Sequence, residues 1–216
     1  MKKTSKALLL GLCALLLVGA SVLGTMAYLT STDTVENKFT VGNVGITLDE
    51  ANVDINGDQE DNTRVKTNDY KLLPSHNYKK DPTIHVTDRS EPCYLFVKVD
   101  NEIADILISA DDKTDEKKVT LANQMAAHGW TNVQDNIYVY GTSKDAAPIV
   151  VNPDDENVEG ANGIVVFDTF TIDDAVDGTT LARFDKKEIT VTAYAIQKDG
   201  FDGKTAAEIW TASKFN

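Results

Sequence analysis

Apolar and polar residues alternate along several short stretches of this chain, a pattern typical of β-strands with one buried face. The clearest stretches are residues 92–99 and 188–196. In the first, one face carries Cys93, Leu95, Val97 and Val99, and in the second it carries Ile189, Val191, Ala193 and Ala195. We therefore predict a central strand over residues 92–99, and the small alanines predict a closely packed facing layer over residues 188–196.

Shorter stretches predict further elements around these two. Strand patterns occur at residues 44–48, 136–140, 147–151 and 163–172, and a turn at residues 74–75 precedes a strand that ends near Thr87. Residues 119–130 and 205–210 have helical patterns, the second with a capping box. Residues 49–69 and 154–162 are acidic, contain few apolar residues and are interpreted as long loops.

Roughly seven or eight strands with acidic loops and two short helices are typical of an antiparallel β-sandwich of jelly-roll type. The predicted fold class is therefore all-β, mainly antiparallel and jelly-roll-like. We expect this fold over residues 44–216.

The N-terminal pattern differs from the rest and predicts a cleaved signal peptide. Residues 1–6 carry three lysines, residues 7–24 are an apolar run, and Thr25 and Ala27 are small residues at the −3 and −1 positions of a signal-peptidase site. A membrane anchor needs about 20 strongly apolar residues, whereas this run is shorter and is diluted by glycine, alanine and serine. We therefore predict cleavage between Ala27 and Tyr28, with residues 1–27 removed.

The side-chain alternation changes phase between the next two apolar stretches. Phe39 and Val41 are at odd positions, whereas Val44, Ile46 and Leu48 are at even positions. With a side-chain period of two, this change requires a bulge or bend near residues 42–43. Residues 28–43 are therefore predicted to be an extended arm that is separable from the first strand of the domain.

The charge of the chain limits its partners. Its net charge is −13 at pH 7, and removing the three leader lysines makes the mature chain −16. This charge argues against nucleic acid or anionic lipid as a partner, so contact with a membrane is expected only through the uncleaved leader. Of the two cysteines, Cys13 lies in the leader and Cys93 in the most apolar strand, so no intrachain disulfide is expected and Cys93 is predicted to be a buried thiol.

One acidic segment has a weak likeness to a calcium-binding loop. Asp54, Asn56 and Asp58 would place oxygen ligands at alternate positions. Gln59 stands where an EF-hand requires glycine, and Val65 stands where it requires a bidentate glutamate. The alternative is a solvated turn at Asn56-Gly57, and calcium is the only cofactor that we consider.

The sequence contains no recognisable catalytic motif. Its histidines are His76, His85 and His128, without the His-Glu-x-x-His spacing of zinc peptidases, and it has neither a nucleophile elbow nor a phosphate-binding loop. Alternating aromatic residues are compatible with a sugar-binding face, but they are more often explained by sheet packing. These are Tyr94, Phe96, Tyr138, Tyr140 and Tyr194. We therefore expect no enzymatic activity.

Two segments resemble the TasA and camelysin family of Gram-positive bacteria. In the first, Gly24-Thr-Met-Ala27 is followed by a polar spacer, by residues 39–42 and by an alternating strand at residues 44–48, with Met26 where an aromatic residue is common. In the second, Lys80-Asp-Pro82 precedes an acidic turn and the strand at residues 94–99. The resemblance covers about half of the chain and is thin over residues 103–163. It implies export through a SipW-type signal peptidase, a jelly-roll fold and fibre formation.

These observations predict a secreted structural protein of the cell surface or extracellular matrix, of the biofilm-fibre type. Its arm would add a strand to the sheet of a like copy or a related matrix subunit, with register set by Leu29, Val35, Phe39 and Val41. The dedicated signal peptidase would be its other partner. The alternatives are a camelysin-like surface metallopeptidase and a calcium- or sugar-binding adhesin module.

Overall fold

The structure is a computed structural model that describes residues 3–27, 42–88, 90–141, 148, 150–152, 163–213 and 215. The chain divides into two compact units, Met1–Val41 and Gly42–Asn216. The first unit contains helix α1 (Lys3–Ala27), whose large apolar side chains between Leu8 and Val18 are 58–76% exposed. Within the described ranges, no helix has the length and apolarity required to cross a membrane.

Residues 28–41 of the predicted arm lie outside the residues that the structure describes, whereas its last two residues belong to the second unit, where the Glu91 N–H donates to the Asn43 carbonyl at 2.9 Å. The range 28–41 includes Tyr28, on the C-terminal side of the predicted cleavage site, and the four predicted register residues Leu29, Val35, Phe39 and Val41. Ala27 is the last residue of α1.

The second unit is mainly antiparallel β-structure with a few short helices, as the alternation predicted. Its strands are β1 (Ile46–Val53), β2 (Gln59–Val65), β3 (Asn77–Lys79), β4 (Thr83–Val86), β5 (Cys93–Asn101), β6 (Trp130–Gln134), β7 (Ile137–Tyr140), β8 (Val150–Val151), β9 (Ile164–Val165), β10 (Thr169–Thr171) and β11 (Ile189–Gln197). Its helices are α2 (Leu121–Ala127), α3 (Gly178–Leu181) and α4 (Ala206–Ser213), with 3-10 turns at Ala104–Ile106 and Ala182–Phe184.

The strands form two larger sheets and one small one. The first sheet has the order β2-β1-β4-β9, and the second has the order β11-β5-β7-β6 with β8 also on β5. Strands β3 and β10 form the small sheet. Side chains of β4 and β9 meet side chains of β5 in the largest hydrophobic cluster, and partly buried residues of β1 and β11 pack against it. The two larger sheets therefore face each other across this core.

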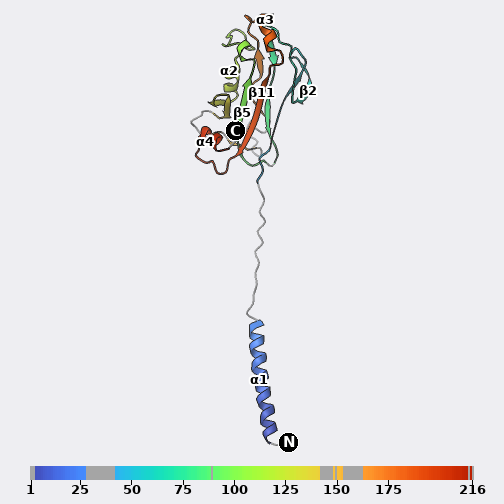
Figure 1. Ribbon diagram of the computed structural model, residues 1–216, viewed down its shortest axis with the longest axis vertical. Helices are drawn as coiled ribbons and strands as arrows, with labels where there is room; N and C mark the ends of the chain where they lie inside the picture. The colour runs from blue at the N-terminus through green and yellow to red at the C-terminus, as the bar shows by residue number, and fades with distance from the viewer. Residues whose placement is uncertain are drawn as a thin grey trace. The chain divides into compact units, whose positions relative to one another are not determined.

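Helix α4 covers the opposite face of the second sheet. Its Ile209 and Trp210 pack with Tyr94 and Phe96 of β5 in a second hydrophobic cluster. Figure 1 shows α4 beside β5 and β11, on the side of this sheet away from β2. Strand β5 is thus buried on both faces, which explains its nearly continuous apolar sequence.

The alternation predicted the faces of the two long strands correctly. Leu95 and Val97 of β5 belong to the core between the sheets, whereas Phe96 belongs to the cluster under α4. On β11, Ala193 packs toward the core between the sheets and Tyr194 toward α4. The small side chains of β11 therefore do face the other sheet.

The interpretation of residues 49–69 as a long loop was wrong. Strand β1 continues to Val53 and pairs with β2, from Glu50 opposite Val65 to Val53 opposite Gln59. The first six residues of β2 are exposed, so the strand has no apolar alternation in its sequence. Backbone pairing with β1 stabilises it instead.

The predicted continuous strand at residues 163–172 is divided between two sheets, β9 in the first and β10 in the small sheet. Two side chains from distant segments fix the bend between them. The Trp130 Nε1–H donates to the Val165 carbonyl at 2.8 Å, and the Gln124 side-chain carbonyl accepts the backbone N–H groups of Asp168 and Thr169, each at 2.9 Å. The strand predicted to end near Thr87 is likewise divided into β3 and β4.

Both predicted short helices are present. Helix α2 follows Thr120 and ends before Gly129, whose φ of +84° favours glycine. Helix α4 begins with the predicted capping box, in which the Thr205 N–H donates to Glu208 Oε2 at 2.8 Å and the Glu208 N–H donates to Thr205 Oγ1 at 3.4 Å. Helix α3 was not predicted.

The burial of Cys93 generates a test of the core. Cys93 has no exposed surface, and burial raises the pKa of its thiol to about 11, whereas Cys13 is exposed. At pH 8, roughly one Cys93 thiol in a thousand is the reactive thiolate. We expect Ellman's reagent to modify one thiol per native full-length chain and two per chain in guanidinium chloride. Equal reactivity of both thiols in the native chain would contradict the packing of β5.

Candidate functional site

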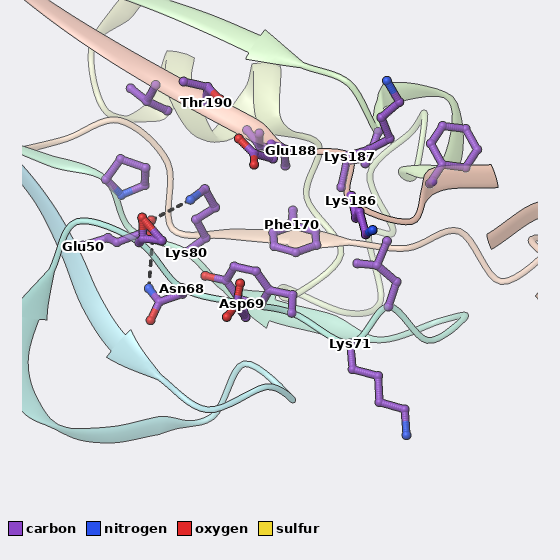
Figure 2. A pocket seen from close by; sticks show the side chains of 18 of the residues that line it. Glu50, Asn68, Asp69, Lys71, Lys80, Phe170, Lys186, Lys187, Glu188 and Thr190 are labelled. Atoms are coloured by element: carbon purple, nitrogen blue, oxygen red, sulfur yellow. Dashed lines mark hydrogen bonds and ion pairs between the residues drawn. The ribbon is translucent and has the colours of Figure 1, made fainter. Parts of the chain in front are cut away.

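A cleft of about 770 Å³ lies on one side of the second unit. One wall is formed by Leu48, Asp49 and Glu50 of β1 with residues 66–72. The opposite wall is formed by residues 181–182 and 184–188 and by the first residues of β11. Figure 2 shows the Phe170 ring of β10 between the paired side chains of Glu50 and Lys80 and the side chain of Lys186.

A buried ion pair lies in one wall. Glu50 is 5% exposed, and its Oε2 accepts a hydrogen bond from Lys80 Nζ at 2.7 Å. Its Oε1 accepts one from Asn68 Nδ2 at 2.9 Å. The Asn68 amide also contacts two β1 backbone groups, the Ala51 carbonyl at 2.9 Å and the Val53 N–H at 3.1 Å. Through Asn68 and Lys80, Glu50 therefore connects β1 to the segments before and after Tyr70.

Tyr70 extends this polar cluster toward the ring of Phe170, which forms the aromatic floor of the cleft. Its hydroxyl donates to the Lys79 carbonyl at 2.9 Å, and its ring meets the Phe170 ring edge-on with centroids 5.2 Å apart. Burial raises the Tyr70 pKa well above its usual range, and the charges of Glu50 and Asp81 raise it further. Tyr70 is therefore a neutral hydrogen-bond donor and has no role as a base at neutral pH.

The charge of the cleft differs from that of the chain. The residues that line it include five lysines, Lys66, Lys71, Lys80, Lys186 and Lys187, and five acids, Asp49, Glu50, Asp69, Asp185 and Glu188. The cleft is therefore formally neutral in a chain of net charge −13. An acidic segment that approaches it meets less repulsion than at the rest of the surface.

Strand β11 presents an open backbone edge on this side of the molecule. The Glu102 N–H donates to the Glu188 carbonyl, and the Lys198 N–H donates to the Pro92 carbonyl. Even-numbered residues of β11 therefore direct their backbone groups toward β5, and odd-numbered ones direct theirs away from it. Within the described residues, β11 pairs only with β5, so its outward N–H and C=O groups are available for another strand.

The first half of β1 has a similar open edge. The Thr87 N–H donates to the Gly45 carbonyl, and the Ala51 N–H donates to Asp81 Oδ1 at 2.6 Å, so odd-numbered residues of β1 point toward β4. Even-numbered residues point the other way, but pairing with β2 begins only at Glu50. The backbone groups of Ile46 and Leu48 therefore point away from β4 and lie beyond the end of the β2 pairing, and Leu48 lines the cleft.

The three weak metal candidates lie together in the β1–β2 turn. Asp54 Oδ1 accepts the backbone N–H groups of Asn56 at 2.8 Å and Asp58 at 2.9 Å. These bonds, first that from Asp58, lower the Asp54 pKa. The turn at Asn56-Gly57, with φ of +83° at Gly57, is thus present, and Asp54 closes it.

The three histidines are distributed over separate positions and have different partners. His76 Nε2 lies 2.8 Å from the Asn56 carbonyl, His85 Nε2 lies 3.3 Å from Asp49 Oδ1, and His128 Nε2 lies 2.7 Å from Asp168 Oδ2. In the part of the chain that is described, no group of three or more His, Cys, Asp or Glu side chains is arranged to hold a metal ion.

The alternating aromatic residues pack within the fold. Tyr94, Phe96 and Tyr140 are buried, and Tyr194 packs against Trp210 with ring centroids 5.1 Å apart. Tyr138 is partly buried against the core between the sheets. Sheet packing therefore explains these positions.

Sequence reasoning did not find the Glu50–Lys80–Asn68 cluster. One signal was present, because Glu50 has the same parity as Ile46 and Leu48 and so belongs to the inward face of β1. An acid on a buried strand face implies a partner charge. Nothing local identifies Lys80, which is 30 residues away in sequence.

Comparisons with protein-family models, with curated proteins and with solved structures found no match to this chain.

The buried pair generates a stability prediction. Replacing Lys80 with Met leaves the Glu50 carboxylate buried without its counter-charge, and we expect the free energy of unfolding to fall by about 3 kcal/mol. Lys98→Met is the matched control, because Lys98 Nζ lies 2.8 Å from Asp100 Oδ2 but both side chains are about 40% exposed. We expect this control to change the free energy of unfolding by less than about 1 kcal/mol. Urea unfolding measures both variants, and equal effects would refute the structural role of Glu50–Lys80.

Proposed function

We propose that this protein is an exported structural subunit of a cell surface or extracellular matrix that assembles into fibres by β-strand addition. The observation that carries the proposal is the open edge of β11 beside the neutral cleft. A strand from another copy would pair with this edge through backbone hydrogen bonds, which need no reacting side chains.

The sequence of β11 supports this role. The strand Ile189–Gln197 pairs with β5 without a register shift over nine residues, and it contains no charged residue, proline or glycine. Edge strands of monomeric proteins are usually short, bulged or protected by charged residues or proline. Strand β11 has none of these protections, so its edge is suited to pairing.

The arm is the proposed donor. Leu29, Val35, Phe39 and Val41 are all at odd positions, so in an extended segment their side chains lie on one face. That face would pack toward the apolar core, while the main chain of the arm pairs with the outward groups of β11. Because the mature chain is strongly acidic, two copies repel each other less at the neutral cleft than the net charge of the chain implies.

The proposal includes export. A dedicated signal peptidase would cleave between Ala27 and Tyr28 and free the arm from α1, whose exposed leucines suit an apolar leader. The resemblance of residues 24–48 and 80–99 to the TasA and camelysin family supports both this processing and a jelly-roll arrangement of the two facing sheets. Secretion to the cell surface or matrix follows from the same leader, and related matrix subunits are further candidate partners.

The donor is tested by deletion. Removing residues 28–38 from the mature protein should leave a domain with unchanged circular dichroism and melting temperature that sediments as a monomer. The unaltered mature protein should sediment as large assemblies and form fibres visible by electron microscopy. Fibres of the same morphology from the deleted protein would exclude the arm as donor.

The acceptor is tested with two prolines at adjacent positions of β11. Ala193 directs its N–H away from β5, so Ala193→Pro should remove an assembly contact and keep the ladder to β5. Thr192 directs its N–H toward β5, so Thr192→Pro should lower the free energy of unfolding by about 3 kcal/mol. We expect Ala193→Pro to be a folded monomer by analytical ultracentrifugation. Normal fibres from this variant would show that assembly uses another edge.

A further inference from the structure

Among the described residues, the side chain of Lys66 covers part of the open edge of β1. The Leu48 carbonyl points away from β4, and Lys66 Nζ donates a hydrogen bond to it. Lys66 is the residue immediately after β2, whose last pair with β1 is Val65 opposite Glu50. A longer β2 would have paired with Leu48 through its backbone, so the Lys66 ammonium group replaces a missing backbone donor.

Hydrogen bonds on either side of Lys66 hold the end of β2 close to the Leu48 carbonyl. Arg64 donates to the carboxylate of Asp49 through Nε, and its Nη2 donates to the backbone carbonyls of Asp49 and Asp81, each at 3.1 Å. Beyond Lys66 the chain leaves β1, and Asn68 bonds to Glu50. The Lys66 position is thus fixed from both sides.

The two open edges beside the cleft are therefore not equivalent. Strand β11 carries no charged residue, whereas the β1 edge carries a lysine, the residue type that most often protects sheet edges. The Cα atoms of β1 and β11 approach within 8 Å, but a strand paired with both edges requires about 9.6 Å between them. A strand that pairs with β11 thus reaches β1 only if the edges move apart and the Leu48 carbonyl becomes free.

We infer that Lys66 controls strand addition at this cleft by covering the Leu48 carbonyl, and that an added strand displaces it to pair with β1 after pairing with β11. This inference rests on the proposed assembly. Lys66 is exposed, so its displacement costs little and leaves the ammonium group hydrated. The lysine therefore slows assembly of the mature protein without preventing it.

The test compares three variants of the mature full-length protein. Lys66→Met removes the donor and should lower the critical concentration for assembly roughly fivefold and shorten the lag phase, as expected for the loss of one typical hydrogen bond at an exposed position. Lys66→Arg keeps a donor and should behave like the unaltered protein. Lys71→Met is the charge-matched control, because Lys71 lines the same cleft but extends away from the Glu50–Lys80 pair (Figure 2), and it should also leave assembly unchanged.

Each outcome decides the inference. Equal assembly of Lys66→Met and the unaltered protein overturns it, and so does the absence of assembly in both. Acceleration by Lys71→Met to the same extent also overturns it, because that result assigns the effect to net charge. The arm is judged separately: if Lys66→Met assembles faster even without residues 28–38, Lys66 controls the edge but another segment supplies the strand.

Discussion

The two-sided burial of β5 is the constraint on which the rest of the structure depends. Its odd-numbered side chains fill the core between the two larger sheets, and Tyr94 and Phe96 fill the cluster under α4. Its backbone pairs with β11 on one side and with β7 and β8 on the other. Since every polar group of a buried strand must be paired, β11 is needed to satisfy β5. This requirement places β11 beside β5, and among the described residues β11 is the last strand of the sheet on that side.

The position of β11 accounts for the properties of the cleft. The side chains of its odd-numbered residues pack toward the core between the sheets, and the backbone groups of these residues point away from β5. The first sheet approaches this side with β1, whose own edge is open only before Glu50. The charged residues of the cleft lie mainly on β1, on residues 66–72 and on the turn before β11, so the edge of β11 remains uncharged.

Local patterns predicted the parts of this fold that local forces determine. The faces of β5 and β11, the capping box of α4 and the turn at Asn56-Gly57 are specified by neighbouring residues, and each is present. Strand β2 was missed because it is exposed and is stabilised through its backbone by β1. In the site, the parity of Glu50 was informative, whereas Asn68 and Lys80 act through contacts that span 18 and 30 residues. No periodicity in the sequence encodes such contacts.

The amide of Gln124 has a mechanical consequence for the cleft. Its Nε2 group donates to the carbonyls of Val119 and Thr169, and its oxygen accepts the N–H groups of Asp168 and Thr169. This one side chain therefore joins α2 rigidly to the start of β10, the strand that carries Phe170. A displacement of α2 would move the aromatic floor of the cleft with it, although α2 does not line the cleft. A force applied to this peripheral helix would thus be transmitted to the cleft that we propose as the site of strand addition.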